Sequence, residues 1–341
     1  MNNICLIKKV FFVSALAIAF NGLQAQSEKL LLDKPGTFKI EYYNDYEQDE
    51  CNFSKAEKTE FYTKLLGLTE VLRKNPVLKD PKGFNCLFSK GRFHCKSKVG
   101  FGIPCEMWVM FHSWSLEDGK EICWTNEPPQ WFMHVNVLRS FRSSNFNYKT
   151  NEPSNPKPGF NMEHWENAAD LVNELFYPPA KKETLEPGID RYNNEWIVLY
   201  NPDRPPYWLP VTVRETFKLL SDFWKNAPVQ ATSDEMLKIL EKEYSGFSEA
   251  ELDGNAYFGD SNSVFQIGSK GELPVMRLNP AYWNKKLPRS SIQIMQFTCP
   301  SDKKNIEYEM NNQLINQSGY YHKSRFLDVL DIRSLLRLIE K

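Results

Sequence analysis

The sequence predicts an α+β protein in which antiparallel sheets are each covered by helices, arranged as two packed halves. Short apolar or alternating stretches rich in β-branched and aromatic residues, typical of strands, occur in both halves of the chain. Between them lie apolar stripes at helical spacing that begin at capping sequences. One long helix followed by several strands is the order expected when a helix covers one face of an antiparallel sheet.

The first half contains one long predicted helix. Ser54 and Glu57 form a capping box, in which each side chain satisfies a backbone amide at the helix start. The apolar stripe that follows repeats at helical spacing, and Asn75-Pro76 ends it. Strands are predicted on either side of this helix, and Asp118-Gly119 predicts a tight hairpin turn. The helical stripe is Phe61, Leu65, Leu68 and Leu72, and the strands are residues 37–43, 84–88, 91–95, 105–113 and 131–137.

The second half is organised around a strand, a proline-rich loop and a helix between Glu195 and Lys225. Residues 195–200 form a short apolar run typical of a buried strand. Thr212 and Glu215 then form a further capping box, and apolar residues recur along one helical face after it. That face is Val213, Phe217, Leu220 and Trp224. The other predicted elements are helices at 165–176, 233–244, 304–316 and 332–339, and strands at 264–267, 275–278 and 291–298.

The first 25 residues match the pattern of a secretion signal. Lys8 and Lys9 precede an apolar run at residues 10–20, and the small residue Ala25 precedes the expected cleavage site. The run is shorter than the ~20 residues that a membrane-spanning helix needs. Cys5 lies upstream of the run and not at the cleavage site, which argues against a lipid anchor. We therefore expect an exported chain, periplasmic or secreted, with no membrane span after cleavage.

A segment rich in Ser, Asn and Pro indicates where the two halves divide. Residues 146–160 carry this composition, which is typical of linkers. The prediction is a signal peptide at 1–25, an N-terminal α+β domain at 26–145, a linker at 146–160 and a C-terminal α+β domain at 161–341.

Cysteine usage favours disulfides. Loss of the leader leaves an even number of cysteines, and export places them where thiols oxidise. Cys95 and Cys105 are equidistant from Gly100 in an expected turn, so on a hairpin they would face each other. The alternative is a metal site using His94 with these two cysteines, but the spacing lacks the C-x-x-C pairs of zinc modules. We predict no metal, and disulfides among Cys51, Cys86, Cys95, Cys105, Cys123 and Cys299.

Several function classes are disfavoured by the sequence. The net charge is −1 and no basic face is visible, which argues against nucleic acid as a partner. The chain has no glycine pattern of nucleotide sites and no His spacing of zinc hydrolases, so no cofactor is expected. Phe258–Asn262 resembles the Gly-Asp-Ser block of GDSL-type esterases, but no Asp-x-x-His sequence follows it to supply the base. Ser261 is therefore interpreted as an ordinary loop hydroxyl.

Aromatic residues held by prolines are the predicted binding surface. Aromatic residues make up 14% of the chain and include nine Trp. In the loop 202–208, Tyr207 and Trp208 offer rigid rings for stacking and Arg204 adds a fork of donors. Tyr282 and Trp283 offer a second ring pair of the same kind. The alternative is that these rings fill the end of the core.

The sequence also resembles a group of uncharacterised exported proteins of Gram-negative bacteria. The resemblance lies in Asn279–Trp283, in Leu287–Ser290 leading into the strand at 291–298, and in Leu209–Thr212 before a helix. It covers chiefly residues 195–341, and it implies a shared domain and export but no activity. Since no complete catalytic set is visible, the expected function is non-catalytic binding in the cell envelope, of a glycan, a peptide or an envelope protein. The alternative is a hydrolase acting on glycans or peptides.

Overall fold

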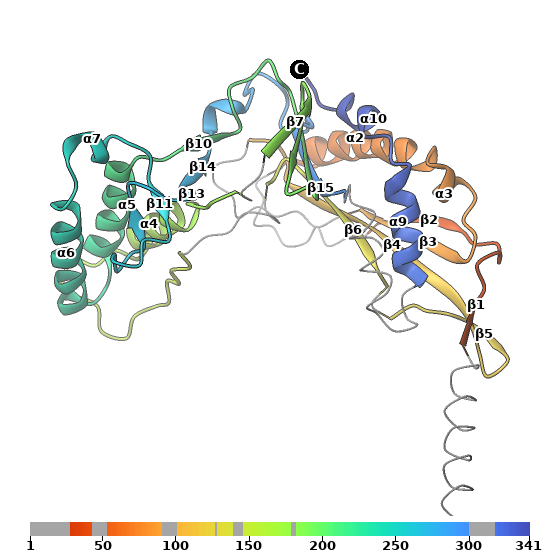
Figure 1. Ribbon diagram of the computed structural model, residues 1–341, viewed down its shortest axis with the longest axis horizontal. Helices are drawn as coiled ribbons and strands as arrows, with labels where there is room; N and C mark the ends of the chain where they lie inside the picture. Colours follow the sequence, from red (N-terminus) through yellow and green to blue (C-terminus); the bar gives the residue numbers. More distant parts are fainter. Residues whose placement is uncertain are drawn as a thin grey trace, which may run out of the picture. The chain divides into compact units, whose positions relative to one another are not determined.

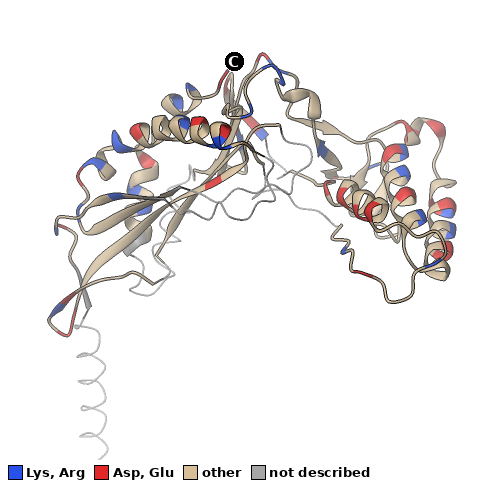
Figure 2. Ribbon diagram, turned by 180° about the vertical axis from the view of Figure 1, so that it is seen from behind, with Lys and Arg blue, Asp and Glu red and all other residues tan. Residues whose placement is uncertain are grey.

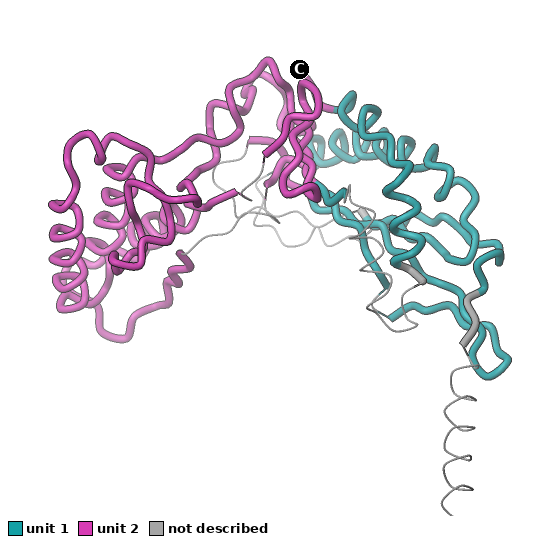
Figure 3. The backbone as a smooth tube through the Cα atoms, viewed as in Figure 1, with its two compact units in different colours: residues 1–94, 105–133, 297–338 teal, residues 95–104, 134–296, 339–341 magenta. Residues whose placement is uncertain are grey.

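The computed structural model describes residues 28–42, 53–90, 101–126, 128–138, 146–178, 182–299 and 318–341. They form helices and largely antiparallel sheets, which confirms the predicted α+β class (Figure 1). The chain divides into two compact units (Figure 3). Unit 1 is Met1–His94, Cys105–Met133 and Phe297–Leu338; unit 2 is Cys95–Pro104, His134–Gln296 and Ile339–Lys341. The linker predicted at 146–160 would separate two domains that fold independently. The division into compact units does not test independent folding, so the linker stays a prediction.

The sheet of unit 1 is built around one long strand, β4. The strand order is β2-β3-β4-β6, and β1 and β5 also pair with β4. The pairs β1–β4, β3–β4 and β4–β5 are antiparallel, whereas β2 runs parallel to β3. The strands are β1 (Glu28–Leu30), β2 (Phe38–Tyr42), β3 (Phe84–Lys90), β4 (Cys105–Glu117), β5 (Lys120–Cys123) and β6 (Gln130–Val135), of which the first four residues belong to this unit.

The predicted hairpin turn at Asp118-Gly119 is confirmed. It joins β4 to β5, whose register pairs Glu117 with Lys120. Both turn residues have positive φ, 47° at Asp118 and 74° at Gly119. This is the left-handed backbone of the tight turns that match strand twist, and Gly adopts it without steric cost.

The described residues of unit 1 contain the helices α2 (Lys55–Arg73), α3 (Pro76–Lys79), α9 (Ser318–Asp328) and α10 (Ile332–Leu336). The predicted capping box at the start of α2 is present in both directions, Ser54 to Glu57 and back. All four residues of the predicted stripe on α2 are fully buried. Helix α9 lies against β4, where the ring of Phe326 contacts those of Phe111 and Trp131 (Figure 1). Aromatic rings therefore fill the contact between α9 and the sheet of unit 1.

Unit 2 contains one larger sheet and two small ones. The larger sheet has the order β15-β9-β8-β7, and the pairs β8–β9 and β7–β8 are antiparallel. Strand β10 pairs with β14, and β11 pairs with β12 and β13. The strands are β7 (Lys182–Glu186), β8 (Ile189–Tyr192), β9 (Trp196–Tyr200), β10 (Trp208–Pro210), β11 (Tyr257–Phe258), β12 (Ile267–Gly268), β13 (Leu273–Pro274), β14 (Met276–Leu278) and β15 (Ile294–Thr298), which begins in this unit.

The helices of unit 2 are α4 (Met162–Asn173), α5 (Val213–Asn226), α6 (Gln230–Tyr244), the short α7 (Glu249–Leu252) and the 3-10 turn η2 (Pro280–Tyr282). Half of the capping box predicted for α5 is present, because Thr212 Oγ1 accepts the amide of Glu215 at 3.1 Å. The Glu215 carboxylate does not return to the cap and instead pairs with Arg277 of β14. The predicted stripe of α5 is buried except at Trp224, which is half-buried.

Two sequence-based expectations need correction. The strand expected at 264–267 exists only from Ile267, because Val264 is 61% exposed and contributes no packing. No disulfide at bonding distance joins any of the four described cysteines, Cys86, Cys105, Cys123 and Cys299. Cys51 and Cys95 lie outside the described residues, as do the leader 1–25, the strand expected at 91–95 and the helix expected at 304–316.

Strand geometry explains why Cys86 and Cys123 do not bridge. Cys86 is paired with Phe111 in β4, and Cys123 is paired with Trp114 three residues further on. Side chains alternate between the two faces of a sheet, so an odd offset places these thiols on opposite faces. Cys86 is fully buried, and this burial raises the pKa of its thiol. Its environment therefore suits a neutral core thiol, which is unreactive.

Candidate functional site

A groove between α5 and α6 is the candidate functional site. It has a volume of about 520 Å³, which is in the range of ligand sites. Its apolar surface comes from Phe217 of α5 and from Leu237 and Leu240 of α6. Phe217 and Leu240 are 3% exposed, while Leu237 is half-buried, so the floor is fixed and the α6 wall is accessible.

The two helices are held by packing beneath the groove and by a short connection. Leu220 and Phe223 of α5 are buried in the main core of unit 2, together with Leu240 of α6. At the connection, the Ser233 hydroxyl donates to the carbonyl of Trp224 at 2.7 Å. Thr212 caps α5 at its other end. A groove whose walls are anchored at both ends is largely preformed, so little ordering entropy opposes binding.

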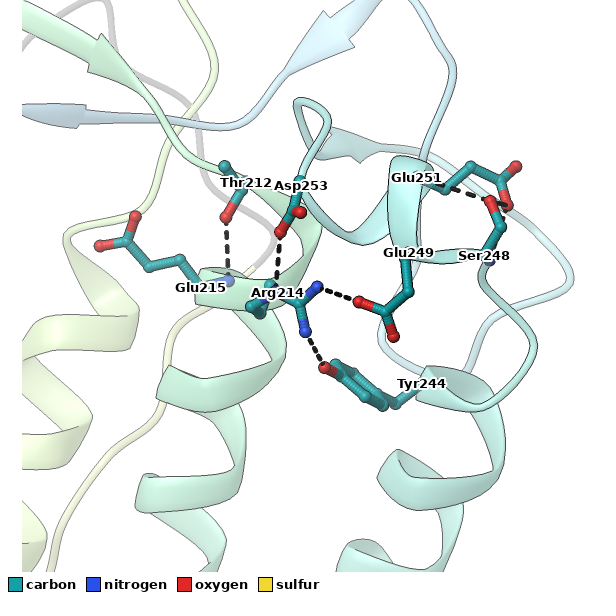
Figure 4. Close-up of polar contacts among 8 residues, drawn as sticks. All are labelled: Thr212, Arg214, Glu215, Tyr244, Ser248, Glu249, Glu251 and Asp253. Carbon is teal, nitrogen blue, oxygen red and sulfur yellow. Dashed lines mark hydrogen bonds and ion pairs between the residues drawn. The ribbon is translucent and has the colours of Figure 1, made fainter.

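Arg214 closes one end of the groove (Figure 4). Its guanidinium donates to Asp253 at 2.8 Å, to Glu249 at 2.6 Å and to the hydroxyl of Tyr244 at 2.7 Å. The hydrogen bond that Arg214 donates to Asp253 raises the pKa of Arg214 most, followed by the one that it donates to Glu249. The contacts tie the first turn of α5 to the end of α6 and to α7. Each nitrogen of the Arg214 guanidinium thus already donates to a side chain of the protein, which makes Arg214 chiefly a positioning residue of the groove.

Two lysines on α5 carry the remaining positive charge of the groove. Lys218 and Lys225 line it and are exposed. Neither of their ammonium groups forms an ion pair with any residue that the structure describes. Among the described lining residues the one carboxylate is Glu241, on the α6 side. Elsewhere on the helices of unit 2 both signs of charge are interspersed (Figure 2).

The structure brings the five predicted binding residues together, and three of the rings are buried. The rings of Tyr207, Trp208 and Tyr282 are 5%, 6% and 1% exposed and belong to one core cluster, against which Trp283 packs. Arg204 lies over the ring of Tyr282 at 5.5 Å, and it donates to Gln293 Oε1 and to the carbonyl of Glu340 at 2.7 Å. Tyr207, Trp208 and Tyr282 therefore fill the core, which is the alternative the sequence left open, while Trp283 and Arg204 are half-buried.

The cavity beside these rings is small. It is lined by Tyr207, Tyr282 and Trp283 among others and has a volume of about 10 Å³. That is room for roughly one water molecule. A glycan ring or a peptide side chain does not fit there without movement of the core.

A buried carboxylate, Asp190, anchors the same region of unit 2. Thr184 donates to its Oδ1 at 2.7 Å, Tyr207 donates to its Oδ2 at 2.5 Å, and Lys182 Nζ lies 2.8 Å from Oδ2. Tyr200 adds a longer contact of 3.3 Å to Oδ1. Burial, followed by the charge of Asp190, raises the pKa of Tyr200 to about 12, so this hydroxyl stays a donor at neutral pH. With four partners for two oxygens, Asp190 is satisfied and its role is structural.

Within the described ranges, no group of three or more His, Cys, Asp or Glu side chains is placed to hold a metal ion. The comparisons add nothing to the site: no protein-family model, curated protein or solved structure matches the chain. The described helices include none that is both long enough and apolar enough to cross a membrane.

Sequence reasoning missed the groove, although one signal was present. Arg214, Lys218, Ser221 and Lys225 recur at helical spacing on α5, next to the apolar stripe. By itself such a polar face is typical of a solvated helix surface. Only the packing of α6 beside it turns that face into the rim of a groove.

Proposed function

We propose that this chain is an exported, non-catalytic binding protein whose ligand site is the groove between α5 and α6. The observation that supports this function is the groove itself, a preformed apolar concavity of about 520 Å³ with a charged rim. A concavity lined mainly by apolar side chains, with a few polar groups around it, is the usual form of a ligand site. The ligand is therefore expected to bring an apolar face or chain.

The composition of the groove favours binding over hydrolysis. Hydrolysis of a glycosidic bond needs two carboxyl groups roughly 5 to 9 Å apart. Among the described residues of the groove, Glu241 is the single carboxylate. A Ser nucleophile would need a base within hydrogen-bond distance. Among the described residues, the hydroxyl of Ser221 forms no hydrogen bond to Lys218 or Lys225, and both lysines are exposed. This lining supports the binding function in preference to the hydrolase.

Titration with a neutral apolar fluorophore, N-phenyl-1-naphthylamine, tests the proposed function. We expect its emission to rise on mixing with the full chain and the rise to be lost in Ser221→Trp, which fills the groove. Thr232→Trp is the matched control, because Thr232 is an exposed residue of α6 that does not line the groove. Equal binding by both variants would place the fluorophore elsewhere and contradict the proposed site.

Export rests on the leader pattern at residues 1–25 and on the resemblance to exported proteins. Intact-mass spectrometry of the protein purified from a Gram-negative expression host tests it. We expect a mature chain that begins at Gln26, recovered outside the cytoplasm. A cytoplasmic protein that keeps all 341 residues would contradict export without affecting the groove.

A further inference from the structure

The basic side of the groove follows one edge of α5. The residues at positions 214, 218, 221 and 225 are spaced by four, three and four, so they lie along one side of the helix. At a rise of 1.5 Å per residue they span about 16 Å, or three helical turns. The apolar floor runs beside them, from Phe217 on α5 to Leu237 on α6. The basic residues of the groove thus all lie on its α5 side.

Two of the basic side chains on the α5 side of the groove are available to a ligand. The guanidinium of Arg214 is already bound by Asp253 and Glu249. Lys218 and Lys225 are exposed, and in the described part of the chain neither has an anionic partner. Seven residues separate these two lysines, which corresponds to about 10 Å along the helix axis. A complementary partner should therefore carry two negative charges about two helical turns apart.

We propose that the occupant of the groove is an amphipathic α-helix of a partner protein, with an apolar face and acidic residues along one edge at a spacing of about seven residues. This inference rests on the proposed binding function and names its ligand class. Apolar side chains of such a helix at positions i, i+3, i+4 and i+7 would cover the groove floor. Its acidic residues at i and i+7 would reach Lys218 and Lys225.

The two separate lysines favour a peptide helix over a single-chain amphiphile. A fatty-acid carboxylate is one charge and can engage one of the two lysines, leaving the other unpaired. A helix packed against α5 and α6 presents charges with the same axial repeat as the lysines, because both are α-helices. Glu241, on the α6 side of the groove, would repel acidic residues there. The acidic edge of the partner helix is therefore expected to face α5 and not α6.

Fluorescence anisotropy with designed peptides tests this inference on the full chain. The probe is a labelled, capped peptide of about 14 residues, long enough for three turns, with Leu on one face and Glu along one edge at i and i+7. A second peptide has Gln in place of each Glu. We expect the Glu peptide to bind about three- to tenfold more tightly than the Gln peptide at low salt, and the difference to shrink as salt is added.

A double charge reversal gives the decisive comparison. Lys218→Glu with Lys225→Glu should abolish the preference for the Glu peptide, and a peptide with Lys in place of Glu should then bind this variant better. Lys238→Glu with Lys242→Glu is the matched control, since both lysines are exposed on α6 away from the groove lining, and it should keep the preference. Equal loss in both variants would mean a general effect of net charge and would overturn the inference.

The outcomes separate this inference from the proposed function. If N-phenyl-1-naphthylamine binds in the groove but the Glu and Gln peptides bind equally or not at all, the binding function stands and the acidic helix is overturned. Tighter binding of dodecanoate than of the Glu peptide, lost on changing a single lysine, would also overturn the helix in favour of an amphiphile. If none of the probes responds to Ser221→Trp, both proposals fall.

Discussion

Asp190 shows how a single buried charge organises one end of unit 2. Its side chain has no exposed surface, and its oxygens are bound by Lys182, Thr184, Tyr200 and Tyr207. Because the one hydroxyl proton of Tyr207 goes to the carboxylate, Tyr192 must donate to Tyr207 across their 2.7 Å contact. The predicted binding rings are thus part of a hydrogen-bonded core, in which losing one hydroxyl affects several groups.

Removing the hydroxyl of Tyr207 should destabilise the fold. Tyr207→Phe leaves one oxygen of Asp190 with Lys182 alone and takes away the acceptor of Tyr192. We expect the free energy of unfolding, measured by urea denaturation, to fall by about 2 kcal/mol, the usual cost of losing a hydrogen bond to a charged group. Tyr200→Phe is the control, because its contact of 3.3 Å is longer and the residue is less buried, and it should cost less. Equal costs would contradict the network.

His322 makes the stability of unit 1 depend on pH. The ring is fully buried and stacks on Phe84, with ring centroids 4.4 Å apart. Burial, and then the nearby charge of Arg325, lower its pKa from 6.5 to about 4, while the backbone of Gly83 acts in the opposite direction. Between these two values the unfolded chain binds a proton that the folded chain excludes. Stability should therefore be complete above pH 6.5 and fall as the pH drops toward about 4.

Urea denaturation at a series of pH values tests this dependence. Between pH 6.5 and about 4, the titration of His322 should lower the free energy of unfolding by about 3 kcal/mol. His322→Leu, which cannot be protonated, should remove that part of the slope while the contribution of the carboxylates remains. The same slope in the variant and in the original chain would show that His322 does not cause it.

At the scale of elements, the sequence predicted best where local chemistry decides the structure. The capping box of α2 and the turn at Asp118-Gly119 follow from side chains three residues apart or from backbone preference. The stripe of α2 follows from helical periodicity. These signals do not depend on which distant segment an element packs against, so they can be recognised from the sequence alone.

Elements defined by tertiary contacts were missed. Helix α9 is not apparent because His322 shares its buried face with Phe326, and a histidine does not count toward an apolar stripe. Strand β7, with the sequence Lys-Glu-Thr-Leu-Glu, has the composition of a helix and is largely exposed at the end of its sheet. Pairing with β8 overrides that propensity. The groove was missed for the same reason, since it exists only where α6 packs beside α5.

The cap of α5 should contribute to both stability and binding. Thr212→Ala removes the acceptor of the Glu215 amide, and we expect the unfolding free energy to fall by about 1 kcal/mol. Because α5 forms one wall of the groove, affinity for N-phenyl-1-naphthylamine should fall as well. Thr212→Ser keeps the hydroxyl and should restore both. Full affinity in Thr212→Ala would mean that the start of α5 does not shape the groove.

At the scale of the whole molecule, distant parts of the chain combine within each unit. In unit 1, the Asn75 side chain donates to the carbonyl of Phe326 at 3.1 Å, across 251 positions of sequence. In unit 2, the chain end at Glu340 is bound by Ser291 and by the amide of Ile292. Local composition cannot reveal such pairings, because partners so far apart share no sequence signal. The export of the chain, in contrast, is predicted by a purely local signal in its first residues.

The central claim is that the α5–α6 groove binds an apolar ligand, and hydrogen–deuterium exchange tests it most directly. Exchange of the full chain should be compared with and without saturating N-phenyl-1-naphthylamine. Bound ligand stabilises the segments that it contacts, so amides of α5 and α6, within Val213–Tyr244, should exchange more slowly while the sheet strands β7 to β9 stay unchanged. Protection confined to other segments, or none in either helix at saturation, would contradict the claim.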